Sequence, residues 1–265
     1  MDIRNVLFRF SAVALLLFMA VVPFSLFGVL APWVLRENNI AGYTAVLHRW
    51  HSAQFGVLWG LLIGGALVAL QFRPAGRPGL VQFLIAIEVL DILMTVLFPT
   101  GDNFQPPFFI GTILFLIILV ATHPDRRALL RLRSDEPPSL LAIALTAIVA
   151  IPLISDMSRN LSWHLAGIGG EHLFWGHWVN AVMADMHLVL AGIMVSLRVV
   201  GWRVLSLLTG LAFVVLGAAA IATPEQDGTW GVMGGALAVF GGLGYLALTV
   251  IDPYGRPRQQ PATAF

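Results

Sequence analysis

The sequence predicts an all-α integral membrane protein: eight transmembrane helices forming two parallel-repeat four-helix bundles, with both termini in the cytoplasm (N-in/C-in). Three observations lead to this prediction: eight long apolar stretches, a skewed distribution of arginines, and a composition that is 58% hydrophobic and only 11% charged. Soluble domains carry roughly 25% charged residues. The composition therefore excludes a soluble enzyme, a disordered tail and a nucleic-acid-binding protein.

The apolar stretches define the spans. A helix needs about 20 mostly apolar residues to cross a bilayer. The eight predicted spans are residues 10–34, 47–71, 79–98, 107–122, 139–156, 173–198, 204–222 and 230–250. We expect the first to be a span and not a removable signal peptide, because its apolar part is too long and no small-residue cleavage site follows it.

The arginines predict the orientation, because cytoplasmic loops carry an excess of positive charge. With the N-terminus inside, only Arg36, Arg49 and Arg159 lie outside. The other twelve lie inside: Arg4, Arg9, Arg73, Arg77, Arg126, Arg127, Arg131, Arg133, Arg198, Arg203, Arg256 and Arg258. We therefore predict a multi-pass protein of the cytoplasmic (plasma) membrane, in contact with the lipid bilayer and with both termini cytoplasmic.

Shifting the sequence by 125 residues superposes the first four predicted spans on the last four, which suggests an internal repeat. The shift brings landmarks together as pairs: Trp50 with Trp175, Arg73 with Arg198, Pro99 with Pro224, and Asp102 with Asp227. Four spans per half is an even number, so the halves form a parallel repeat. The predicted units are residues 1–134 and 139–265, joined by a cytoplasmic linker at 135–138.

Glycines recur on two of the spans. Gly56, Gly60 and Gly64 lie four apart on span 2, and Gly231 and Gly235 lie four apart on span 8. Small residues at this spacing let helices approach closely in lipid. We expect these faces to pack, either within the bundle or between copies in an oligomer.

Six of the seven histidines lie on spans 2 and 6 or on the outer side: His48, His51, His164, His172, His177 and His187. Imidazole is the commonest metal ligand, and haem iron takes one or two axial histidines. On one continuous helix, His48 and His51 share a face, whereas His172 and His177 diverge by about 140°. One ligand per half is therefore expected. The alternative interpretation is hydrogen bonding at the membrane interface.

Aromatic residues flank these histidines and have two interpretations. They either line a flat cofactor or form an interfacial belt, and the belt needs no cofactor. The residues are Trp50, Trp59, Trp175, Trp178, Phe55 and Phe174.

Ionisable residues also fall near the membrane midplane. Glu88 and Asp91 share one face of span 3, and Asp185 and His187 lie at mid-depth on opposite sides of span 6. Acids in a bilayer need a partner or a proton, which makes them functional candidates. We assign Glu88 and Asp91 to proton handling, and His187, Asp185 and His172 to a candidate metal site. The alternative is a polar staple between helices.

This chain resembles the heme A synthases in its eight spans, its two tandem halves, its two cytoplasmic termini and the His48-Arg49 pair that opens span 2. This resemblance implies haem held at the outer ends of the spans, with axial roles for His48 and for His177 or His172. The family's further histidines at the outer ends of spans 4 and 8 have no counterpart here, where the sequence reads Pro106-Pro107-Phe108-Phe109 and Thr229-Trp230-Gly231-Val232. Only the axial roles of His48 and His177 carry over.

The leading hypothesis is a haem- or metal-binding membrane protein of redox type, acting in electron transfer, haem modification or oxidase assembly. His48, His51, His177 and Arg49 would bind the cofactor, which is haem or alternatively a copper or iron ion. Its partners would be quinone or other membrane redox subunits, and not nucleic acid. The alternatives are a proton-coupled transporter that uses the midplane carboxylates, and a cofactor-free subunit of a larger membrane complex.

Overall fold

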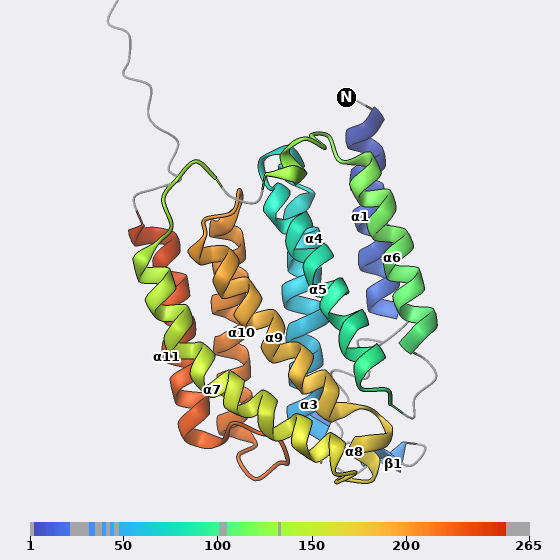
Figure 1. Ribbon diagram of the computed structural model, residues 1–265, viewed down its shortest axis with the longest axis vertical. Helices are drawn as coiled ribbons and strands as arrows, with labels where there is room; N and C mark the ends of the chain where they lie inside the picture. Colours follow the sequence, from blue (N-terminus) through green and yellow to red (C-terminus); the bar gives the residue numbers. More distant parts are fainter. Residues whose placement is uncertain are drawn as a thin grey trace, which may run out of the picture.

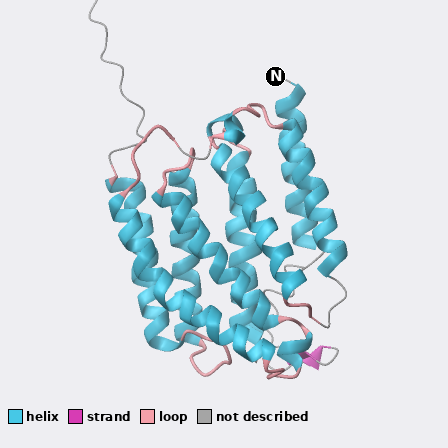
Figure 2. Cartoon of the chain, viewed as in Figure 1, coloured by secondary structure: helices cyan, strands magenta, loops and turns pink. Residues whose placement is uncertain are grey.

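The computed structural model describes residues 3–21, 32–34, 39–40, 43–44, 48–100, 105–131 and 134–252, and most of these are helical (Figures 1 and 2). A two-residue antiparallel ladder joins β1 (Asn39–Ile40) to β2 (Tyr43–Thr44). The longer helices are α1 (Ile3–Val21), α5 (Pro78–Leu97), α6 (Gln105–Thr122), α7 (Leu140–Leu165), α9 (His177–Ser196), α10 (Trp202–Ala222) and α11 (Gly231–Ile251). The shorter ones are α3 (Arg49–Phe55), the π-helix η2 (Gly56–Gly64), α4 (Gly65–Leu70), α8 (Glu171–Phe174), and the 3₁₀ turns η3 (Pro74–Gly76) and η4 (Ala128–Leu130).

Among the described residues, seven helical segments are long and apolar enough to cross a membrane, counting α3, η2 and α4 as one continuous segment. The apolar part of α6, Phe108–Thr122, is shorter. Large apolar side chains also cover the outside of the bundle: Val96, Ile151 and Phe240 are 72% to 73% exposed. Such a surface suits lipid and not water. The protein is a multi-pass helical membrane protein.

Both ends of the described chain lie at the same end of the bundle, α1 beginning there and α11 finishing there (Figure 1). This end carries the inside arginines of the predicted orientation that fall on described residues. The orientation itself and the eighth span stay predictions. Residues 22–31, within the predicted first span, lie outside the described residues.

Three helix boundaries differ clearly from the predicted spans. Helix α1 begins at Ile3 and not at residue 10. Helix α7 continues to Leu165, beyond the predicted end at 156, because Asp156 and Asn160 turn into the bundle and are buried. Helix α9 begins at His177 and not at 173, because Gly176 has a left-handed backbone with φ of 68°. Glycine adopts this conformation without the steric cost that a side chain brings.

The helices pack in two groups that meet along one interface. The first group is α1, α3 to α4, α5 and α6, and the second is α7, α9, α10 and α11. At the interface, α5 packs on α9, and the α3–η2–α4 segment packs on α10. The backbone of Gly79 also donates to Val200 O at 3.0 Å. The predicted units, residues 1–134 and 139–265, and their relation as a repeat stay predictions.

The predicted linker is anchored by an ion pair. Arg198 donates to Asp252 Oδ2 at 2.6 Å and to the Pro137 carbonyl at 2.5 Å. Ser139 also donates to Asp252 Oδ2, at 3.3 Å. The start of α7 and the ends of α9 and α11 are therefore held together.

Glycines bring α10 and α11 into backbone contact. A Cβ atom at Gly210 would lie 2.8 Å from the Gly242 carbonyl oxygen, and one at Gly235 would lie 2.6 Å from the Gly217 carbonyl oxygen. This confirms the packing role of Gly235. Gly231 begins α11 and Gly60 lies on η2, and a Cβ on either would meet nothing within 4 Å. The packing role predicted for these two is therefore wrong within this chain.

We expect Gly210→Leu to lower the stability of the folded protein by about 1–3 kcal/mol or more, because the added side chain meets backbone that cannot move aside. Thermal unfolding in detergent measures this. Gly60→Ala is the matched control and should unfold at the wild-type temperature. Equal unfolding temperatures for the two variants would contradict the close α10–α11 contact.

Candidate metal centre

Four imidazole rings gather at the end of the bundle opposite to Ile3. His48 and His51 come from the start of the second span, His172 from α8 and His177 from α9. Their ring centroids are 4.7 to 6.2 Å apart. Two pairs stack across the interface: His48 on His172 at 4.9 Å, and His51 on His177 at 4.7 Å. We call these four residues the histidine cluster.

Three members of the cluster form a ligand set. One nitrogen from each of His48, His172 and His177 lies within 4.8 Å of the other two. His48 and His177 are buried, and His172 is partly buried. Two imidazole nitrogens bound to one metal at about 2.0–2.1 Å are at most about 4.2 Å apart. Small side-chain movements would therefore bring this set onto a single ion.

The helix break at Gly176 produces this arrangement. His172 and His177 would diverge on a continuous helix, but they lie on separate helices and their rings are 5.3 Å apart. The expectation of divergence, and hence of one ligand per half, was wrong for this reason. The structure brings two histidines from each helix group together.

One tryptophan packs against the cluster, and a second is buried at the start of α3. Trp178 is buried, stacks on His172 at 4.9 Å and donates from Nε1 to Ile168 O at 2.8 Å. Trp50 is also buried, and its backbone N–H donates to Gln226 Oε1 at 2.8 Å. These two tryptophans therefore belong to the bundle interior and not to an interfacial belt. Trp175 and Phe174 are 39% and 54% exposed, as a belt requires.

The fourth histidine is oriented by a neighbour on its own helix. His51 Nδ1 lies 3.1 Å from Gln54 Oε1. If Nδ1 donates to this oxygen, Nε2 keeps its lone pair for a ligand, which is how metal-binding histidines are usually held. His51 Nε2 is buried and has no hydrogen-bond partner among the described residues. Gln54 was not a predicted site residue, although its position three residues after His51 is a detectable signal.

Arg49 lies outside the cluster. Its Nε donates to the Pro32 carbonyl at 2.8 Å, and beside it the Trp33 indole donates to Ser52 Oγ at 2.9 Å. The structure therefore places this predicted cofactor-binding residue beside the segment that precedes span 2.

The predicted midplane residues form a separate pair. His187 Nε2 lies 2.8 Å from Asp91 Oδ1, and neither side chain is more than 1% exposed. Glu88 is buried one helical turn away from Asp91 on α5. The structure therefore pairs span 3 with His187 through Asp91, and His187 is not part of the ligand set with His172.

Asp185 joins a second acidic group. Its carboxyl group lies near that of Asp156 on α7, and both of its oxygens are buried without a hydrogen-bond partner among the described residues. Asp156 pairs with Arg159 and accepts from Asn160 Nδ2 at 2.9 Å. Asp185 therefore belongs to this group and not to the ligand set that includes His172.

A glycine connects this acidic group to the histidine cluster. Arg159 donates to Gly228 O at 2.9 Å. Gly228 has φ of +75°, and a Cβ there would lie 3.2 Å from Asn160 Oδ1 and 3.5 Å from His51 Cε1. The fully buried Asn160 Oδ1 has no hydrogen-bond partner among the described residues. Sequence reasoning had no signal for Asn160 or Gly228, because their proximity to His51 depends on how α7 and the 223–230 loop fold over the cluster.

The two remaining histidines lie elsewhere. His123 is buried, with its ring 5.1 Å from Phe8, and burial lowers the pKa of its imidazole. His164 on α7 packs against Phe98, with ring centroids 6.2 Å apart. Neither belongs to the histidine cluster.

Comparison with known proteins gives no match: no protein-family model, no curated protein and no solved structure is similar to this chain. The geometry alone shows a histidine group that can hold a metal ion, with buried acids on the neighbouring helices.

We expect His187→Leu to destabilise the protein by about 3–5 kcal/mol, because it leaves the Asp91 carboxyl group buried without its imidazole. Adding Asp91→Leu removes the buried carboxyl group that has lost its partner and should recover part of the lost stability. Reversible unfolding in mixed detergent micelles measures both free energies. A double variant less stable than His187→Leu alone would show that the two side chains do not stabilise one another.

Proposed function

We propose that this protein binds one transition-metal ion of redox type, copper or iron, at the histidine cluster within the membrane. The observation that supports this most directly is the compact ligand set of His48, His172 and His177, with nitrogens within 4.8 Å of one another. Neutral imidazole is the commonest metal ligand. An ion shared by these three imidazoles would join the two helix groups from which they come.

The ligand type narrows the choice of ion. The set contains imidazoles only, and the chain has no cysteine. Imidazole suits copper, iron, nickel and zinc, whereas calcium and magnesium prefer oxygen ligands. Three ligands leave a coordination position open, as catalytic metal sites do. His51 lies beside this set, where it would act as a fourth ligand or orient a molecule that binds at the open coordination position.

The spacing of the rings supports an ion better than haem. Two axial imidazoles on one iron place their ring centroids roughly 6 Å apart, with a porphyrin plane between them. Every pair of rings across the helix interface is instead 4.7 to 5.0 Å apart. His172 is also stacked on Trp178, which occupies one face of that ring. Haem would require these helix ends to separate.

The acidic group beside the cluster gives the site a way to balance charge. A bound ion that gains or loses an electron changes its charge, and compensation inside a low-dielectric bundle needs a nearby proton. A carboxyl group at Asp156 or Asp185 would supply such a proton, and Asn160 links Asp156 to the Gly228 region beside His51.

We expect the purified wild-type protein to carry about one copper or iron ion per chain, and His172→Ala or His177→Ala to lower the metal affinity at least about tenfold. Elemental analysis and electron paramagnetic resonance measure the content and identity of the ion. His164→Ala is the control and should keep the wild-type metal content, because this histidine lies outside the cluster.

Two results would contradict the proposal. A Soret band that disappears in His48→Ala would show haem. Wild-type protein that binds neither copper nor iron after reconstitution would indicate a cofactor-free subunit.

A second candidate function is proton-coupled transport, and the buried Asp91–His187 pair favours it. Along α9, Met183 lies between His177 and His187, and it is buried with Met94 of α5. Thioether and imidazole ligands suit monovalent copper. In this case the cluster would be an entry site and not a redox centre.

If the protein is such a carrier, proteoliposomes should take up copper when a pH gradient is imposed, and Glu88→Gln should abolish the uptake because it removes a buried proton-binding group. His164→Ala should transport normally. Uptake that is independent of the pH gradient would contradict proton coupling.

A further inference from the structure

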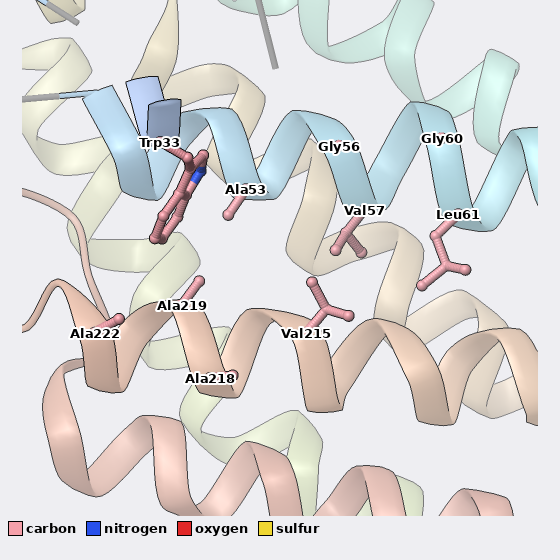
Figure 3. A pocket seen from close by; sticks show the side chains of 10 residues that line it. All are labelled: Trp33, Ala53, Gly56, Val57, Gly60, Leu61, Val215, Ala218, Ala219 and Ala222. Carbon is pink, nitrogen blue, oxygen red and sulfur yellow. The ribbon is translucent and has the colours of Figure 1, made fainter. Parts of the chain in front are cut away.

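An apolar groove of about 650 Å³ runs between the second span and α10 (Figure 3). Ala53, Gly56 and Gly60 lie on one wall, and Val215, Ala218 and Ala222 lie on the other. Val57 and Val215 point toward each other across the groove, and Trp33 stands at its end beside Ala53 (Figure 3). The volume lies within the range of small-molecule sites, about 300–1,000 Å³.

The groove is unusual because small residues on facing membrane helices normally bring the backbones together. In this protein they do so between α10 and α11, where Gly217 and Gly235 are in backbone contact. The other face of α10 carries Ala218, Ala219 and Ala222 opposite glycines of η2, yet a gap remains. A Cβ at Gly60 would meet nothing within 4 Å. The small side chains therefore widen the groove here and do not bring the two helices into contact.

The shape and lining of the groove suit a hydrocarbon chain. It follows the helix axes from Ala53 to Leu61, which is about 12 Å at 1.5 Å per residue. A chain lying in it would run along the spans, as acyl chains do in a bilayer. All ten lining residues are apolar or glycine.

A positive charge stands at one end of the groove. Arg49, Ala53, Gly56 and Gly60 recur at helical spacing and therefore share one stripe. Arg49 lies one turn beyond Ala53, where the span ends and Trp33 closes the groove. No described carboxylate lies within ion-pair distance of Arg49. A guanidinium at the polar edge of a membrane pairs well with phosphate.

We propose that this groove binds one phospholipid, with a hydrocarbon chain between the second span and α10 and its phosphate at Arg49. Ala53 lies two residues after His51, about 200° around the same helix, so the lipid would lie on the side of the helix opposite to His51. This inference does not depend on the metal, because the groove and Arg49 lie outside the ligand set.

Native mass spectrometry of the intact protein with added phosphatidylglycerol tests the proposal. Wild-type protein should keep one tightly bound phospholipid after detergent washing. Gly60→Leu should lose it because the side chain fills the groove, and Arg49→Gln should weaken it about tenfold because the charged hydrogen bonds are lost. Gly76→Leu also enters open space but lies at the other end of the second span, so it should bind lipid like the wild type.

Elemental analysis of the same samples tests lipid binding independently of metal binding, because Gly60→Leu should retain the metal content of the wild type. Unchanged phospholipid binding in both Gly60→Leu and Arg49→Gln would overturn the proposal. A bound molecule without phosphorus, such as a quinone, would also overturn it. A wild-type dimer that Gly60→Leu converts to a monomer would show instead that the groove is an interface between copies.

Discussion

The cost of enclosing polar side chains in an apolar bundle is the constraint on which the rest of this structure depends. A buried polar group without a partner is expensive in any protein, and a membrane offers no water to supply one. The chain answers this constraint by grouping its polar residues. Asp91 lies against His187, Asp156 contacts Asp185 and Arg159, and four histidines gather at one end.

These polar groups lie on the interface between the two helix groups or beside it. The Asp91–His187 pair joins α5 to α9, and the histidine cluster joins the start of the second span to α8 and α9. Each therefore fixes the position of one helix group relative to the other. An ion at the cluster would strengthen this junction, because its ligands come from both groups. The same helices would then provide both the stability of the bundle and its chemistry.

Small residues have opposite effects on the two faces of α10. Toward α11, Gly210 and Gly217 allow backbone contact. Toward the second span, alanines and the glycines of η2 leave an apolar groove that ends beside Arg49. The difference arises from the partner helix and not from α10 itself. A glycine motif in a membrane helix therefore permits a close approach without determining whether it occurs.

The sequence by itself determined the helical membrane class, because composition and apolar length depend only on residue types. It also identified the histidines, and it placed Asp91 and His187 at similar depth, because depth follows from counting along a helix. The tertiary structure decided which of these residues meet. His172 and His177 converge only because Gly176 breaks the helix between them, and Asp185 lies near Asp156 only because α7 packs on α9. The packing of segments that are distant in the sequence decides the neighbours of Asn160, Gly228 and Arg49. Local spacing sets the direction of a side chain on its own helix, but the rotation and end point of the neighbouring helix decide what that side chain touches.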